Sequence, residues 1–259
     1  MTRDASVARR ASTLAARRLI VALDDTELAP TVAMARRLRG LARTLKVGSI
    51  LFTACGPEMI RRVRALGFEV MLDLKFHDIP STVELSCRSA VRHRISLLTV
   101  HGSGEEAMLA AAVRGCRLEA RRRGLPRPRV LAVTVLTSVA SDGIAAKTMR
   151  MAAKAQRAGC DGVVTSAREA PALRRRFGRT MLIVCPGIRP AHAAAYDQRR
   201  VATPAHALER GADCLVVGRP ITSAPDPRRA AVRILEEMRR AAGVDARRAA
   251  GVDERRASG

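Results

Sequence analysis

Eight short apolar runs, separated by segments long enough to form helices, constrain the fold of this chain more than any other feature. Most of the runs are almost continuously apolar, which is typical of parallel strands covered on both faces. Eight strands alternating with helices are the number that closes a (β/α)8 TIM barrel, and we predict this α/β fold. The predicted strands are Leu19–Asp24, Leu45–Ser49, Glu69–Phe76, Leu97–Gly102, Val130–Leu136, Gly162–Ser166, Met181–Gly187 and Cys214–Pro220.

A doubly wound sheet would show the same alternation, but its first strand is usually followed by a glycine-rich turn. Leu23-Asp24-Asp25-Thr26 stands at that place and contains no glycine. The chain has 259 residues, of which 47% are hydrophobic, so it can bury one large core. We therefore expect one barrel domain, which would be the catalytic domain, over residues 18–242.

Both ends of the chain are expected to lie outside this domain. Residues 1–17 are rich in Ala, Ser and Arg, and we predict a flexible basic segment there. The last helix is expected to begin at Asp226-Pro227 and to stop at Gly243. A short polar sequence without an apolar face then occurs twice, so we predict a disordered tail over residues 243–259.

Location and metal content follow from what the composition lacks. No apolar run reaches the roughly 18 residues of a membrane span, and the N-terminus has no apolar signal-peptide core, so we expect a cytoplasmic protein. The six cysteines form no CxxC motif or Cys/His cluster, which argues against zinc and against a disulfide framework. The five histidines lack metal-ligand spacing, and the carboxylates near the strand ends are matched by lysines, so a metal is not needed to explain the site.

The charge balance is strongly basic, with 47 Lys and Arg residues against 24 Asp and Glu residues, a net charge of +23. Such a charge favours nucleic-acid binding, because Arg and Lys neutralise phosphates. A general preference for Arg is the simpler interpretation, since Ala is also abundant and only four Phe and one Tyr could stack on bases. We therefore expect neither a nucleic-acid partner nor a membrane partner.

Polar residues gather where the predicted strands end, which is the end of such a barrel that carries chemistry. Only four lysines occur in the chain; Lys46 lies on the second predicted strand, and Lys75 lies near the end of the third. Lysine can give up a proton and arginine effectively cannot, so retained lysines suggest a function. Asp73 and Lys75 are two residues apart on one strand and should point the same way. A purely structural ion pair is the alternative interpretation.

An anion site is predicted opposite these residues. Gly218-Arg219-Pro220 follows the eighth predicted strand, where barrels often bind phosphate. Glycine lets backbone N–H groups approach a phosphate, and Arg189 on the preceding loop can add a bidentate contact. Ordinary turn chemistry would explain the same Gly-Arg-Pro sequence.

Seven segments, in the same order, resemble the orotidine 5′-phosphate decarboxylase family over roughly Leu19 to Met238. The combination of DxKxxDIP with PGIRP and DQRR makes the resemblance specific. The segments are Val21-Ala22-Leu23-Asp24, Leu45-Lys46-Val47-Gly48, Asp73–Thr82 (DLKFHDIPST), Val133–Ser138 (VTVLTS), Pro186–Pro190 (PGIRP), Asp197-Gln198-Arg199-Arg200 and Val217–Pro220 (VGRP).

This resemblance implies a homodimeric barrel that decarboxylates orotidine 5′-phosphate to uridine 5′-phosphate, the last step of de novo synthesis of that nucleotide, without metal or cofactor. It implies that Lys46, Asp73, Lys75 and Asp78 form the charged catalytic set, with Asp78 supplied to the neighbouring subunit's site. The other implied substrate-binding residues are Asp24 at the ribose; Ile79, Pro80 and Thr82 beside Asp78; Thr137 and Ser138 at the pyrimidine; and Pro186, Arg189, Gln198, Gly218 and Arg219 around the phosphate.

Two rival functions stay open at this point. A Mg²⁺-dependent sugar-phosphate decarboxylase or aldolase of the same superfamily keeps DxKxxD, but Asp197-Gln198 and Thr137-Ser138 argue against it. A non-catalytic nucleic-acid-binding barrel would leave the retained lysines unexplained. Arg92-His93-Arg94, before the fourth predicted strand, is more basic than the resemblance leads us to expect, and we predict that it lies at the surface.

Overall fold

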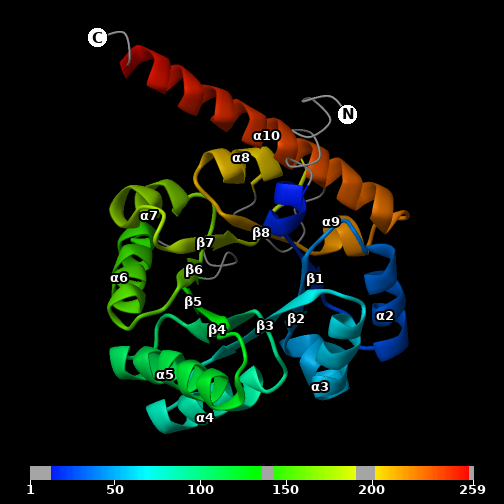
Figure 1. The fold of residues 1–259 in the computed structure, drawn as a ribbon, viewed down its shortest axis with the longest axis vertical. Helices are drawn as coiled ribbons and strands as arrows, with labels where there is room; N and C mark the ends of the chain where they lie inside the picture. The colour runs from blue at the N-terminus through cyan, green and yellow to red at the C-terminus, as the bar shows by residue number, and fades with distance from the viewer. Residues whose placement is uncertain (1–12, 136–142, 191–201, 257–259) are drawn as a thin grey trace.

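The computed structural model describes residues 13–135, 143–190 and 202–256, with side chains as far as residue 241. Its eight strands pair in parallel and in sequence order, and β1 also pairs with β8, so the sheet closes into a barrel. The predicted (β/α)8 fold is confirmed (Figure 1). The strands are β1 Leu19–Leu23, β2 Thr44–Gly48, β3 Glu69–Phe76, β4 Leu97–His101, β5 Arg129–Val133, β6 Gly162–Val164, β7 Leu182–Cys185 and β8 Cys214–Val217.

Helices follow the strands and surround the barrel, and the last of them, α10, crosses one side of the barrel over α8 (Figure 1). Among the described residues, no helix combines the length and apolarity that crossing a membrane requires. The helices are α2 Leu28–Arg37, α3 Ser49–Ala65, α4 Pro80–Val91, α5 Glu106–Arg123, α6 Ile144–Arg157, α7 Ala170–Phe177, α8 Pro204–Glu209, α9 Arg219–Thr222 and α10 Pro227–Arg256.

Alternation along the strands divides the core into two layers. In β1, Ile20 and Ala22 point into the barrel, where they pack with residues such as Met71 and Val216. Val21, between them, packs in the outer layer against the helices. Because the inner layer fills the barrel with side chains, the interior is a packed core and not a pore. Along the barrel axis, room for a ligand is therefore left at the two ends of the barrel.

The chain differs from the sequence-based expectation at its ends. Residues 13–18 are helical, although a flexible segment was predicted as far as residue 17. The last helix does not stop at Gly243 but continues to Arg256, so the predicted disordered tail is wrong for this stretch. Ala and Arg are strong helix formers, and their abundance outweighs the roughly 1 kcal/mol that a glycine costs inside a helix. The domain boundaries stay predictions.

Strand ends differ as well, because several strands give way to loops early. The eighth strand stops at Val217 and not at Pro220, since Arg219 already begins the short helix α9. The sixth stops at Val164, before the predicted Ser166. The predicted end of the fifth strand, Leu136, lies outside the described residues.

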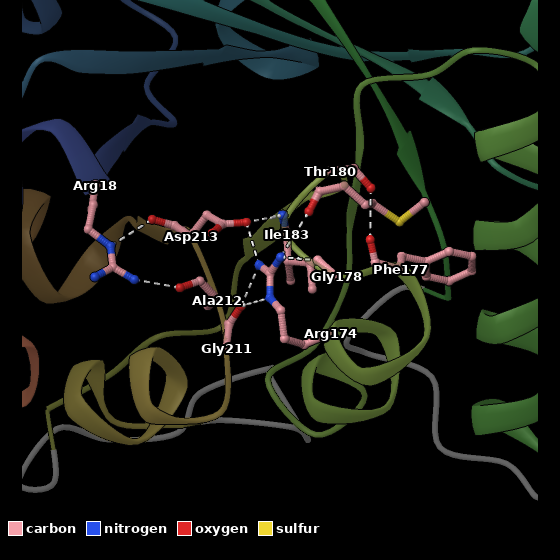
Figure 2. A network of polar contacts seen from close by, with 10 residues as sticks. Arg18, Arg174, Phe177, Gly178, Thr180, Ile183, Gly211, Ala212 and Asp213 are labelled. Atoms are coloured by element: carbon pink, nitrogen blue, oxygen red, sulfur yellow. Dashed lines mark hydrogen bonds and ion pairs between the residues drawn. The ribbon is translucent and has the colours of Figure 1, made fainter. Parts of the chain in front are cut away.

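A polar network ties the starts of β7 and β8 to helix α7 (Figure 2). Asp213 Oδ2 accepts hydrogen bonds from Arg174 Nη2 at 2.6 Å and from the backbone N–H of Ile183 at 2.8 Å. Arg174 also donates to the carbonyl oxygens of Gly211 and Gly178. One carboxylate and one guanidinium thus satisfy backbone groups of β7, of the turn after α7 and of the loop before β8, which fixes this part of the barrel wall.

We expect Asp213→Asn to lower the free energy of unfolding by about 1–3 kcal/mol, because it weakens charge-assisted hydrogen bonds in a half-buried site. Urea denaturation followed by circular dichroism measures the change. Glu58→Gln is the control, because the ion pairs of Glu58 with Arg61 and Arg62 lie at the surface. It should change stability by less than about 0.5 kcal/mol. Equal effects of the two variants would contradict the role assigned to Asp213.

Candidate active site

A cavity of about 280 Å³ opens at the carboxyl ends of the strands. Its floor is the inner apolar layer, represented by Met71, Val164 and Val216. Its walls bring together eight of the residues singled out in the sequence, which are Asp24, Lys46, Asp73, Lys75, Pro186, Arg189, Gly218 and Arg219. Residues far apart in the chain thus meet at one end of the barrel because parallel strands all end there.

Asp73 is the centre of the charged side of the cavity. Its Oδ2 atom lies 3.0 Å from Lys75 Nζ and 3.6 Å from Lys46 Nζ. Lys46 Nζ also contacts Asp24 Oδ1 at 3.0 Å. Asp73 and Lys46 are both 9% exposed, whereas Asp24 and Lys75 are more open to solvent. Two ammonium groups against two carboxylates leave the cluster without net charge. Such compensation is what makes burial of the charges affordable in free energy.

Thr99, on β4, holds the second oxygen of Asp73. Its hydroxyl donates to Asp73 Oδ1 at 2.9 Å and accepts from the backbone N–H of Lys75 at 3.0 Å. Burial by itself would raise the pKa of Asp73, but Lys46, Lys75 and the hydrogen bonds from Lys75 and Thr99 together lower it below the usual value. Asp73 is therefore a carboxylate at neutral pH.

Lys75 has an unusual backbone conformation, with a positive φ of 51°. The pairing of β3 with β4 shifts register between Leu72 and Phe76, so the strand bulges at this point. Simple strand alternation, which predicts that Asp73 and Lys75 point the same way, is therefore not what brings them together. The positive φ costs of order 1–2 kcal/mol for a residue other than glycine, and such strain is characteristic of functional sites.

The ammonium group of Lys46 occupies space left free by Gly48, two residues further along β2. A Cβ atom added to Gly48 would lie 2.8 Å from Lys46 Nζ, so only glycine leaves the ammonium group in its place. Gly48 therefore has a steric role that the sequence analysis did not assign.

The opposite wall of the cavity carries the two arginines predicted at the anion site. Arg189 is 5% exposed, and Arg219 is exposed at the start of α9. Residues on either side of Arg189 are tied down, because its backbone N–H donates to Ala202 O at 2.9 Å and Ala202 N donates to Gly187 O. The cavity thus has a lysine–carboxylate side and an arginine side. This arrangement suits a ligand whose anionic group binds the arginines while its other end reacts at the lysines.

Several predicted site residues are not part of this cavity in a single chain. Asp78, Ile79, Pro80 and Thr82 lie at the exposed start of α4, where Asp78 Oδ1 accepts from the N–H of Ile79 at 2.6 Å. Thr137, Ser138 and Gln198 lie outside the described residues.

Two hydroxyl residues were missed by the sequence analysis. Thr99 is polar within the apolar run Leu97–Val100, a signal that could have found it. Thr165 follows β6 and lines the cavity, and its buried hydroxyl has no hydrogen-bond partner among the described residues. No sequence pattern distinguishes Thr165 from an ordinary turn residue.

Histidines lie beside the cavity but form no metal site. The rings of His77 and His101 stack with centroids 5.1 Å apart. Burial, and to a smaller extent the electrostatic effect of neighbours that include Lys75 and Lys147, lowers the pKa of His101, so this ring is neutral at pH 7. Within the described part of the chain, no group of three or more His, Cys, Asp or Glu side chains is placed to bind a metal ion.

Comparisons with known proteins agree with these features. A family model described as orotidine 5′-phosphate decarboxylase / HUMPS family matches residues 17–234. Orotidine 5′-phosphate decarboxylase from Geobacter sulfurreducens is 45% identical over 230 residues, covering 85% of this chain and 95% of the relative. The enzyme of the same name from Halorhodospira halophila is 47% identical, covering 86% and 97%. The crystal structure of orotidine 5′-phosphate decarboxylase from Lactobacillus acidophilus is 34% identical with a TM-score of 0.75, covering 86% and 99%.

Thr99→Val should raise the pKa of Asp73, because it removes a hydrogen bond that favours the charged carboxylate. A carboxylate with a lowered folded pKa stabilises the fold above its unfolded pKa, and this stabilisation is lost as the pH falls through the folded pKa. The variant should therefore lose about 1–3 kcal/mol at pH 7 and begin its acid decline at a higher pH. Unfolding by urea between pH 3 and pH 7, together with carboxyl NMR titration, measures both changes.

Thr99→Ser keeps the hydroxyl and is the matched control for this prediction. In this variant the pKa of Asp73 should be the same as in the original protein. Its stability should fall only by the packing energy of one methyl group. An unchanged Asp73 titration in Thr99→Val would show that the hydroxyl has no electrostatic role.

Proposed function

The chain belongs to the orotidine 5′-phosphate decarboxylase / HUMPS family, and we propose that it converts orotidine 5′-phosphate to uridine 5′-phosphate and CO2 without a metal or cofactor. The observation that carries the proposal is the nearly buried Asp73 between two lysines in a cavity whose other wall carries Arg189 and Arg219. The family description covers a second activity, but both relatives at 45–47% identity have the decarboxylase name.

Lys75 is the residue to which we assign the proton transfer. When the bond between C6 of the pyrimidine and its carboxylate breaks, CO2 leaves and the electron pair stays on C6. The ammonium group of Lys75 stabilises this negative charge and then transfers a proton from Nζ to C6, which completes uridine 5′-phosphate. Arginine could supply the charge but hardly the proton. In many enzymes a preorganised charge of this kind makes the largest single contribution to stabilising the transition state.

Asp73 and Lys46 position Lys75 and complete the charge balance. Asp73 is held by Thr99 and both lysines, so it keeps Lys75 Nζ in one place within a half-buried site. In the proposed complex Asp73 lies beside the departing carboxylate, and its negative charge favours loss of that group. Whether this acts as repulsion or as preorganisation, the requirement on Asp73 is that it be ionised.

The remaining contacts would bind the ends of the substrate. We assign the ribose hydroxyls to Asp24, beside Lys46, and the phosphate to Arg189, Gly218 and Arg219, together with Pro186 in the cavity wall. Gln198 is proposed for the phosphate and Thr137-Ser138 for the pyrimidine, on the resemblance alone. Binding a phosphate remote from C6 supplies energy for orienting the reacting end.

We propose further that two copies of the chain form a homodimer through α3 and α4. A groove of about 420 Å³ here has apolar walls that include Phe52, Leu74 and Phe76. Ile79, just before α4, and Leu85, on α4, are 63% and 60% exposed, which is unusual for large apolar side chains. The exposed Asp78 adjoins this surface, so a second copy bound here could receive it in its cavity.

Activity is tested first by the ultraviolet absorbance change on adding orotidine 5′-phosphate in the presence of EDTA. We expect turnover, and a Lys75→Ala variant should lose at least about 10³-fold in kcat, because it lacks both the charge and the proton. Lys75→Arg should stay inactive although it keeps the charge. Turnover by Lys75→Ala, or activity of the original protein only with Mg²⁺ and sugar phosphates, would overturn the proposal.

The shared site is tested by mixing two inactive variants, Lys75→Ala and Asp78→Asn. If Asp78 acts in the neighbouring subunit, each mixed dimer contains one site with both original residues. Random reassociation should then restore about a quarter of the original activity. Absence of any recovery, with mixed dimers demonstrated by mass spectrometry, would place Asp78 outside the neighbouring site. The cytoplasmic location expected from the sequence stays a prediction.

A further inference from the structure

A second and larger cavity, of about 680 Å³, lies at the other end of the barrel. It is lined by the first residues of six strands, including Thr44, Leu97 and Leu182, so it opens where the strands begin. Ile20 and Leu97, with partly buried Leu182 and Cys214 packed against them, form its apolar floor. The inner layer of the barrel separates it from the candidate active site. The two cavities are therefore separate.

The walls of this second cavity are unusually basic. Only one carboxylate, Glu69, is among its lining residues, and it is already paired with Arg43 at 2.7 Å. A second lining arginine, Arg127, is paired with Asp161 just outside the cavity. The arginines that line the cavity are Arg17, Arg43, Arg64, Arg94, Arg127 and Arg129.

The remaining four of these arginines, Arg17, Arg64, Arg94 and Arg129, have no ion-pair partner among the described residues. Nearby arginines behave differently. Arg18 donates to the carbonyl oxygens of Asp213 and Ala212, so its guanidinium is already occupied (Figure 2). Four like charges around one cavity repel one another, and a bound anion would relieve that repulsion.

Two of these four arginines, Arg94 and Arg129, have further features that relate them to the cavity. Arg94 ends the basic Arg92-His93-Arg94 turn before β4 and has a φ of +53°, a conformation that glycine or asparagine usually adopts. Arg129 lies close enough to Cys214, on the cavity floor, to affect its ionisation. Burial raises the pKa of the Cys214 thiol to about 11, and the charges of Arg18 and Arg129 oppose that rise. Of this basic turn, Arg94 lines the cavity, whereas Arg92 is paired with Glu119.

We propose that this cavity binds a compact oligophosphate, either free or as the phosphate chain of a nucleoside triphosphate. Guanidinium groups bind phosphate oxygens in a bidentate manner, and several of them match a ligand with several charges. A volume of about 680 Å³ is that of a small-molecule pocket, and its closed floor favours a compact ligand over a nucleic-acid strand. The apolar floor could accept a base. The proposal stands apart from the decarboxylase reaction and gives the excess arginine a function.

The test is isothermal titration calorimetry of the full chain with inorganic tripolyphosphate and with adenosine triphosphate, at about 0.15 M salt to screen diffuse attraction. The variant Arg94→Gln/Arg129→Gln should weaken binding of both by at least about tenfold. Arg117→Gln/Arg121→Gln is the matched control. It removes the same charge from exposed positions of α5 outside the cavity, and it should bind as the original protein does.

Three results would overturn the proposal. One is the absence of measurable binding, and another is equal weakening by both double variants, which would mean a diffuse charge effect. The third is loss of binding in Arg219→Gln with full binding in Arg94→Gln/Arg129→Gln, which would place the ligand in the candidate active site. Equal binding of the two probes would assign recognition to the phosphates, and tighter binding of adenosine triphosphate would add the apolar floor.

Discussion

Closure of the parallel sheet is the constraint on which the rest of this structure depends. Pairing of β1 with β8 brings the first and last thirds of the chain together and directs every strand end to one rim. Lys46 on β2, Asp73 on β3 and Arg219 after β8 meet there only because the circle is complete. The apolar inner layer closes the barrel axis, so the two ends can evolve separate chemistry.

The two ends solve the problem of concentrated charge in different ways. In the candidate active site the lysines are matched by carboxylates, and Asp73 stays ionised because two ammonium groups and Thr99 outweigh the effect of its burial. In the cavity at the other end, six arginines face one carboxylate, and guanidinium groups stay charged whatever their surroundings. Matched charge makes a preorganised site for one reaction, whereas unmatched charge makes a site that attracts an anion.

The strands were predictable because both faces of each are covered, and continuous apolar runs record that burial directly. The end of α10 was not, because a glycine within an Ala- and Arg-rich stretch is a weak signal against the summed helix propensity around it. The bulge at Lys75 and the hydrogen bond from Thr99 to Asp73 were missed for another reason. Both depend on the neighbouring strand, which no local pattern describes.

The sequence by itself determined the order of strands and helices, the retention of lysine at Lys46 and Lys75, and the residue types of the anion site. These are local properties, recorded in periodicity and in the choice of side chain. Tertiary structure alone decided that Lys46, Asp73 and Thr99 share one cluster, and that Arg94 and Arg129 face a common cavity. Charge and hydrogen bonding act over a few ångströms in space, and separation along the chain carries no measure of that distance.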